Sequence, residues 1–147
     1  MTQGSNSDAK PLSWQEQHMR EYLESGGKEG HIWHGVPTLL LTTTGHKSGQ
    51  ERMTPLIYGR DGDHYLIVAS RGGTPDHPSW YKNLVAHPDI EIQVGPDRIK
   101  ARARTASAAE KPALWKKMTA IWPQYDEYQT KTSREIPVVV IEPSQKP

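Results

Sequence analysis

The feature that most constrains the fold is a series of short β-type segments joined by glycine-containing turns. The run 36–44 (VPTLLLTTT) is β-branched and leucine-rich and stops at Gly45, which is typical of a buried strand. The turns Asp61-Gly62-Asp63 and Gly95-Pro96-Asp97 each separate two such segments and predict hairpins. We predict strands at 36–44, 52–60, 64–70, 90–94, 98–104 and 136–141. About six strands joined mostly by tight turns favour an antiparallel barrel over a repeated βαβ fold.

Three helices are expected beside these strands, which makes the fold class mainly β with flanking helices (α+β). The first covers 12–23, and a short second one begins at Pro78 or Ser79. Ser107 followed by Glu110 is a capping-box pattern that predicts a third helix reaching Trp122. Pro112 fits this start poorly and predicts a later one, and Pro55 predicts an edge or bulge within 52–60.

Length and composition limit the number of domains and the classes of function open to this chain. A chain of 147 residues predicts one domain, which we place at 12–142 between a disordered arm (1–11) and a tail (143–147). The formal net charge of +1 gives no bulk attraction for nucleic acid. Without cysteine there is no disulfide, thiolate or Cys-based metal site. No apolar run reaches membrane-spanning length and no signal peptide is evident, so we expect a cytoplasmic protein.

Two stretches carry candidate chemistry. The segment 42–52 (TTTGHKSGQER) runs from a strand into a glycine-bounded loop whose N–H groups, Lys47 and Arg52 suit an oxyanion. It is not a Walker P-loop, because the GxxxxGK[ST] order is absent. The segment 69–73 (ASRGG) ends a strand and leads to a helix N-terminus at Ser79, a second place suited to an anion.

Taken together, these stretches carry a resemblance. Thr-Thr-Gly-x-Lys-Ser-Gly-x-x-Arg-x-x-Pro-Leu, then Ala-Ser-x-Gly-Gly, then Pro-x-Trp-Tyr-x-Asn-Leu and His-Pro occur in one order, with Trp-Pro-x-Tyr-x-x-Tyr and Ile-Pro-Val-Val further on. Between Gly35 and Pro143 the chain therefore resembles the deazaflavin (coenzyme F420)-dependent nitroreductase family. The resemblance implies a split β-barrel of the FMN-binding type that uses the 8-hydroxy-5-deazaflavin cofactor.

The resemblance also implies site residues. Cations and small residues would border the cofactor's anionic tail and flat ring, and the implied cofactor-binding set is His46, Lys47, Ser48, Arg52, Met53, Thr54, Pro55, Leu56, Ile57, Val68, Ala69, Ser70, Arg71, Ser79, Trp80, Tyr81, Lys82, Asn83 and Tyr125. Ile57, Trp122, Tyr125 and Tyr128 would line the substrate side, with no metal involved. A nitroimidazole-activating relative has tyrosines at the positions of Ile57 and Trp122 and arginine at that of His46, so its drug activity is not assumed.

The reaction implied is transfer of a hydride from reduced deazaflavin to an activated acceptor such as a quinone, an unsaturated lactone or a nitroaromatic. Ser70 would orient the acceptor, and Tyr125 or Tyr128 would donate a hydrogen bond or proton, with solvent as the alternative proton source. The alternatives are an FMN-dependent relative of the same barrel and a non-catalytic protein that binds deazaflavin.

Three other features of the sequence have simpler structural explanations. His31, Trp33 and His34 form a histidine-rich loop but lack the carboxylate support of a metal site. Four basic residues alternate along 98–104 and are interpreted as a solvated strand face rather than a nucleic-acid surface. The helix at 12–23 is expected to pack on the barrel, with peripheral membrane contact as the alternative. We expect a monomer that acts on a small molecule.

Overall fold

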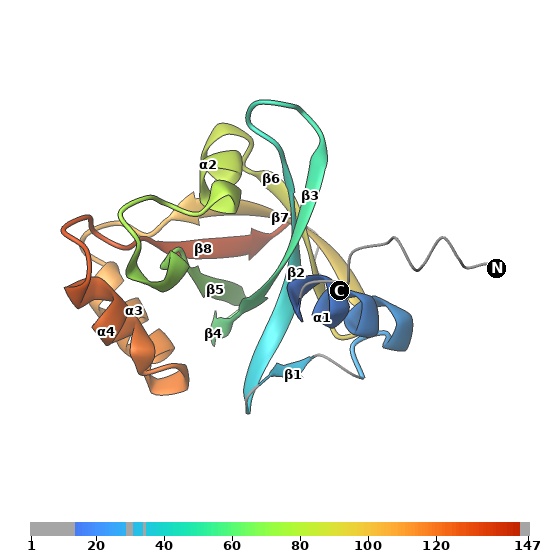
Figure 1. The fold of residues 1–147 in the computed structure, drawn as a ribbon, viewed down its shortest axis with the longest axis horizontal. Coiled ribbons are helices and arrows are strands. Elements are labelled where there is room, and N and C mark those ends of the chain that lie inside the picture. Colours follow the sequence, from blue (N-terminus) through green and yellow to red (C-terminus); the bar gives the residue numbers. More distant parts are fainter. Residues whose placement is uncertain (1–13, 29–30, 34, 145–147) are drawn as a thin grey trace, which may run out of the picture.

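The computed structural model describes residues 14–28, 31–33 and 35–144, which form one curled antiparallel sheet flanked by helices (Figure 1). The strands are β1 (Ile32–Trp33), β2 (Val36–Thr44), β3 (Glu51–Ile57), β4 (Gly59–Asp61), β5 (His64–Val68), β6 (Asp89–Val94), β7 (Asp97–Thr105) and β8 (Val138–Pro143). The helices are α1 (Trp14–Ser25), α2 (Ser79–Ala86), α3 (Lys111–Ile121) and α4 (Gln124–Thr130), and η2 (Arg71–Gly73) is a 3-10 turn.

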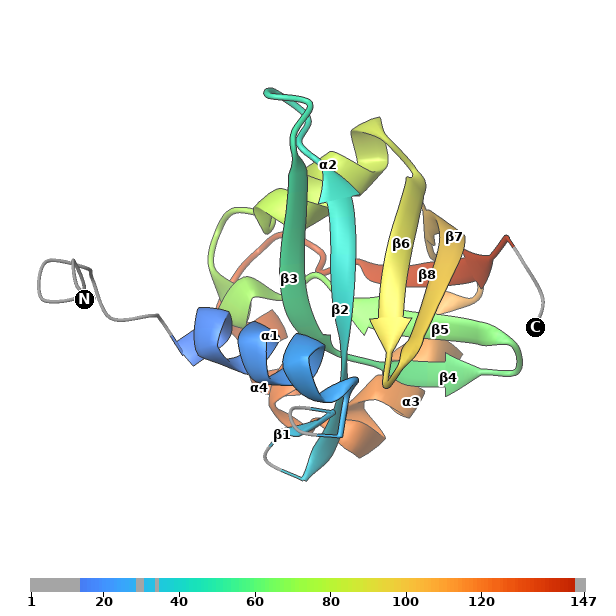
Figure 2. The same cartoon turned by 90° about the vertical axis from the view of Figure 1, so that its right-hand side faces the viewer.

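The strand order is β1-β2-β6-β7-β8-β5-β4, and β3 pairs with β2 beside this path. Figure 2 shows β2, β3, β6 and β7 running steeply across the direction of β4, β5 and β8, as expected when a sheet curls into a barrel. This arrangement confirms the predicted split barrel and its class, mainly β with flanking helices. The expected arm at 1–11 lies outside the described residues.

The predicted strand 52–60 is wrong in one respect, because the structure divides it at Tyr58. The first part is β3, which pairs only with β2, and the second is β4, which pairs with β5. The Tyr58 N–H donates to the Pro37 carbonyl at 3.2 Å. Alternation along an antiparallel ladder then turns the backbone of Pro55 to the unpaired edge of β3. The missing N–H of Pro55 therefore costs no ladder hydrogen bond, and its prediction of an edge is confirmed.

The run 136–141 is continuously apolar because β8 and its neighbour β5 are buried on both faces. Ile67, Val139 and Ile141 face the barrel interior, together with residues of β2 and β6. Alternate residues of the same two strands belong to a second cluster, which they form with α3 and α4: Leu66, Val68, Val138, Val140, Leu114, Met118 and Tyr125. Each fully buried Val, Leu or Ile stabilises the fold by about 1.5–3 kcal/mol.

The predicted capping box forms, but the helix starts after it. The Ser107 N–H donates to the Glu110 carboxylate at 2.7 Å, and the Glu110 N–H donates to Ser107 Oγ at 3.3 Å. Helix α3 begins at Lys111 with Pro112 in its first turn, which confirms the expected later start. Helix α4 was not predicted as a separate element; Pro123 before it and acidic Asp126 in its first turn are the signals that mark its beginning.

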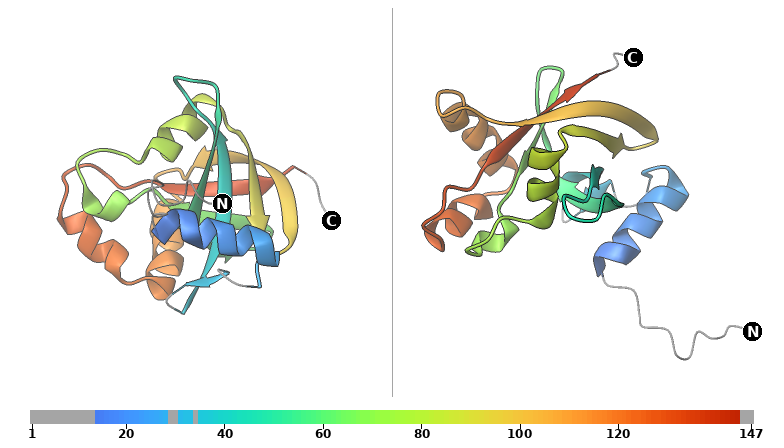
Figure 3. Two further views of the ribbon diagram at one scale, coloured as in Figure 1. Left: turned by 45° about the vertical axis from the view of Figure 1, so that its right-hand side comes forward. Right: turned by 90° about the horizontal axis from the view of Figure 1, so that it is seen from above.

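Helix α1 packs against β3, and its His18 and Tyr22 side chains are buried. The Tyr22 hydroxyl lies 3.2 Å from the Gln93 carbonyl and accepts a hydrogen bond from the Gly95 N–H at 2.6 Å. This supports packing on the barrel, where Figure 3 also shows α1. Among the described helices, none is long and apolar enough to cross a membrane.

Candidate active site

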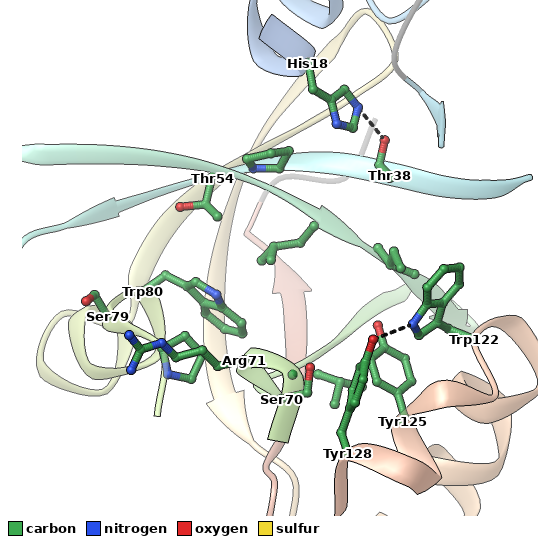
Figure 4. A pocket seen from close by; sticks show the side chains of 16 residues that line it. His18, Thr38, Thr54, Ser70, Arg71, Ser79, Trp80, Trp122, Tyr125 and Tyr128 are labelled. Atoms are coloured by element: carbon green, nitrogen blue, oxygen red, sulfur yellow. Dashed lines mark hydrogen bonds between the residues drawn. The ribbon is translucent and has the colours of Figure 1, made fainter. Parts of the chain in front are cut away.

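A cavity of about 370 Å³ lies beside β3, which pairs with β2 along one edge only (Figure 4). We call it the aromatic pocket, because Trp80 stands at one end and Trp122, Tyr125 and Tyr128 are grouped at the other. Its remaining wall comes from β3, the end of β5, η2, the start of α2 and two residues on the far side of β3. These residues are Thr54, Pro55, Leu56, Ile57, Val68, Ser70, Arg71, Gly72, Pro78, Ser79, His18 and Thr38.

A second cavity of about 610 Å³ adjoins the first. We call it the basic pocket; it is lined by Met19, Gly45, His46, Lys47, Ser48, Glu51, Arg52, Met53, Thr54, Ser79, Trp80 and Asn83. The two pockets share Thr54, Ser79 and Trp80, so they meet at the N-terminus of α2. Lys47 and Arg52 are exposed and have no ion-pair partner within the described ranges, which leaves both charges available to an anion.

The loop between β2 and β3 is held by Asn83 of α2. The Asn83 Oδ1 accepts hydrogen bonds from the His46 backbone N–H at 2.9 Å and from His46 Nδ1 at 2.6 Å, while its Nδ2 donates to Thr43 Oγ1 at 3.1 Å. Because Oδ1 can only accept, His46 Nδ1 carries a hydrogen. The Asn83 amide is thus engaged by protein partners on both sides, and its geometry is that of a positioning residue for the basic pocket.

The start of α2 presents unpaired backbone donors where the pockets meet. Pro78 occupies the N-cap, and its carbonyl accepts from the N–H groups of Tyr81 and Lys82. The N–H groups of Ser79 and Trp80 precede the first helical hydrogen bond and have no intrahelical partner. No acidic side chain lies in this first turn, so the positive end of the helix dipole is uncompensated there.

The Tyr125 hydroxyl stays protonated because it is buried. Burial, with a smaller contribution from neighbouring Tyr128, strongly raises the pKa of the Tyr125 hydroxyl. The Trp122 Nε1–H donates to the Tyr128 hydroxyl at 3.4 Å, which leaves the Tyr128 proton free for another acceptor. The two tyrosine rings meet edge to face, with centroids 6.1 Å apart. This end of the aromatic pocket therefore offers tyrosine O–H donors to a developing anion.

Most of the predicted site residues are brought together by the structure. The exceptions are Ala69, Tyr81 and Lys82, which line neither pocket. Ala69 is fully buried in the barrel core, and the Tyr81 hydroxyl lies 2.8 Å from Thr105 Oγ1. The predicted set missed seven lining residues, namely His18, Met19, Thr38, Gly45, Glu51, Gly72 and Pro78. No local motif marks His18 or Met19, because only the packing of α1 on β3 brings them there. Thr38 reaches the pocket from β2, where it pairs with Ile57 of β3.

Residues of the histidine loop and of the basic strand face form hydrogen bonds and ion pairs with other protein groups. His31 Nε2 lies 2.9 Å from the Tyr58 hydroxyl, His34 lies outside the described residues, and the described residues contain no group of three or more His, Asp and Glu able to hold a metal. On β7, Arg102 pairs with Asp89 at 3.4 Å, and Arg104 pairs with both Glu110 and Glu142. Half of the basic strand face is thus neutralised by carboxylates.

The curled antiparallel sheet and the two-part pocket along its free edge place the chain in the class of split β-barrel proteins. Within that class, the chain belongs to the F420H(2)-dependent quinone reductase family, which it matches over residues 14–143. An F420H(2)-dependent quinone reductase of Mycobacterium tuberculosis is 47% identical over 128 residues, which are 84% of this chain and 86% of the relative. The resemblance inferred from the sequence motifs is confirmed.

Two solved structures of similar sequence agree with this family assignment and with the fold. An F420-H2 dependent reductase (FDR-A) is 44% identical, with a TM-score of 0.67 over 72% of this chain and 94% of that one. A second structure, described as a domain-swapped dimer, is 38% identical, with a TM-score of 0.71 over 86% of this chain and 92% of that one. The second finding weakens the expectation of a monomer.

Proposed function

We propose that the chain binds coenzyme F420 with its ring in the aromatic pocket and its anionic tail in the basic pocket, and that it reduces a quinone or similarly activated acceptor. The observation that carries the proposal is the junction of the two pockets at Thr54, Ser79 and Trp80. On one side lie Lys47 and Arg52, which form no ion pair with the described residues, and on the other lie a flat apolar wall and tyrosine hydroxyls. A ligand with a planar head and a charged tail fits both parts.

The residues suit this cofactor in detail. Lys47, Arg52 and the N–H groups of Ser79 and Trp80, which have no intrahelical partner, would hold the acidic tail, with Ser48 beside them. Among the described residues that line the basic pocket, Glu51 is the one carboxylate. The cofactor set proposed from the sequence is retained here for the residues that line the two pockets, with Asn83 acting by positioning the loop. Ala69, Tyr81 and Lys82 are left out of the proposed set because they line neither pocket.

When bound, reduced F420 supplies a hydride, that is, two electrons and one proton. The protein's own contribution is to orient the acceptor, exclude water and provide the second proton. We assign orientation to Ser70, whose side chain lines the aromatic pocket next to the tyrosines. Tyr128 is the proposed donor to the oxygen that becomes negative, because its oxygen already accepts from Trp122. Tyr125 and Ile57 complete the acceptor side.

Binding tests this proposal directly. The quenching of Trp80 and Trp122 fluorescence should saturate as oxidised F420 is added to the purified protein, because both indoles line the aromatic pocket. FMN at matched concentrations is the comparison, since it shares a flavin-like ring but has a shorter tail. Preference for F420 supports the assignment of the basic pocket. Preference for FMN would replace the cofactor but keep the barrel, and binding of neither would overturn the proposal.

A further inference from the structure

Arg134 lies between α4 and β8 and reaches across to the segment that carries Ser70 and Arg71. Its Nε–H donates to the Thr74 carbonyl at 2.9 Å, and one terminal nitrogen donates to the Ser70 carbonyl at 2.7 Å. The other terminal nitrogen donates to the Ala69 carbonyl at 3.2 Å and lies 3.0 Å from His77 Nδ1. One guanidinium thus binds backbone on both sides of η2.

The backbone that Arg134 spans needs such support. Arg71, Gly72 and Gly73 have φ angles of 45°, 65° and 82°, so three consecutive residues lie in the left-handed region. For Arg71, which carries a Cβ, this conformation is unfavourable unless its surroundings impose it. The hydrogen bonds within the turn are few, namely Gly73 N–H to the Ser70 carbonyl at 2.9 Å and Thr74 N–H to the Arg71 carbonyl at 3.3 Å.

Arg134 is itself fixed to the helix that carries the tyrosines. Gln129 of α4 donates from Nε2 to the Arg134 carbonyl at 2.8 Å, and its Oε1 accepts from the Ile136 N–H at 3.0 Å. On the other side of the turn, Gly73 lies so close to α4 that a Cβ there would be 2.5 Å from the Tyr128 carbonyl oxygen. The connection from α4 to η2 through Gln129 and Arg134 is therefore continuous.

We propose that Arg134 is a positioning residue of the reductase site, which holds the Ser70–Gly73 segment at a fixed distance from Tyr128 on α4. It acts through backbone carbonyls and does not line either pocket. This inference depends on the proposed function in one respect: the reaction whose rate Arg134 affects is the proposed reduction of a quinone. A lysine would not replace the arginine, because an ammonium group lacks the planar fork that reaches separate carbonyls at once.

The pKa of His77 depends on Arg134 and can be measured without catalysis, so it tests this connection independently. Its Nδ1 accepts a hydrogen bond from Arg134, so the imidazole is neutral with its hydrogen on Nε2. Burial lowers the pKa of His77 first, then the charges of Arg134 and Lys82, while Asp76 opposes them. Removing the guanidinium deletes one of the causes that lower this pKa, which should then rise.

The test compares R134Q and R134K with R60Q as the matched control. Arg60 also donates to a backbone carbonyl, that of Gly62 at 3.2 Å, but it lies in a hairpin that lines neither pocket. In the cofactor-free protein, we expect R134Q to speed amide exchange at Gly73 and Thr74 at least tenfold and to raise the His77 pKa measured by NMR. In turnover with F420H2 and a naphthoquinone, we expect R134Q and R134K both to lower kcat at least tenfold at saturating substrates.

Unchanged exchange and an unchanged His77 titration in R134Q would overturn the proposal, and so would a wild-type kcat in R134K. If R134Q does not fold, Q129A removes the other end of the connection and should also speed exchange at Gly73; failure to do so would equally overturn it. If wild-type protein neither binds F420 nor turns over, the proposed function fails, but the exchange and titration results still decide the role of Arg134.

Discussion

Replacing Gly73 with alanine should disturb the site more than the same change at Gly72. Both glycines have positive φ angles, 82° and 65°, so each alanine carries a cost of about 1–2 kcal/mol for the left-handed conformation. Only at Gly73 does the new Cβ meet backbone, lying 2.5 Å from the Tyr128 carbonyl oxygen and 3.0 Å from its Cα. At Gly72 nothing lies within 4 Å.

The contact at Gly73 should add about 1–3 kcal/mol, the usual range for overpacking, because helix backbone cannot move aside as a flexible side chain can. We therefore expect G73A to lower the free energy of unfolding by about 2–5 kcal/mol and G72A by about 1–2 kcal/mol. Urea denaturation followed by circular dichroism measures both. Because α4 carries Tyr125 and Tyr128, G73A should also lower kcat, whereas G72A should change it little. Equal destabilisation by the two variants would refute the packing of η2 on α4.

Three further predictions follow. K47A and R52A should each weaken F420 binding by about 1.5 kcal/mol or more, roughly tenfold, in the fluorescence titration, because each removes a charge-assisted hydrogen bond. K82A is the control, since Lys82 lines neither pocket. Wild-type affinity in K47A or R52A would remove that residue from the site. Y128F should lower kcat about 100-fold at saturating substrates if its hydroxyl donates the proton, with Y81F as control, whereas an unchanged rate would leave solvent as the donor. Arg104 and Ser107 lower the pKa of Glu110 from 4.5 to about 2. The stability that these contacts add is therefore present above pH 4.5 and is lost as the pH falls toward 2. E110Q should lose this part of the acid dependence in melting curves between pH 2 and 6, and the same pH dependence in E110Q and the wild type would contradict the assignment.

The strands could be predicted because their signals are local. Alternation and turn residues mark β5, β6 and β7, and the run 136–141 is apolar throughout because β8 is covered on both faces. The division at Tyr58 could not be predicted, since the strand pattern continues through it and only the curling of the sheet transfers the chain from β2 to β5. The close approach of α3 to Gly59, where a Cβ would lie 2.7 Å from Met118 Sδ, is likewise a tertiary contact.

The site was predictable where residue type and motif agree. Lys47, Arg52, Ser70 and the late tyrosines lie in ordered motifs, and the structure brings them to two adjoining pockets. Arg134 carries no such signal: it is one basic residue in a polar segment, and its role depends on carbonyls about sixty residues earlier in the chain. The contributions of His18 and Met19 depend in the same way on where α1 packs.

The central claim is that the two-part pocket holds reduced F420 for hydride transfer to a quinone. The most direct test is anaerobic single turnover, in which the protein loaded with F420H2 is mixed with a soluble naphthoquinone and formation of oxidised F420 is followed by absorbance. We predict one oxidised F420 and one hydroquinone per occupied site, at a rate far above that of the two compounds alone and reduced in Y128F. Saturable binding of F420H2 with no protein-dependent oxidation by quinone would contradict the account and leave a binding protein without this activity.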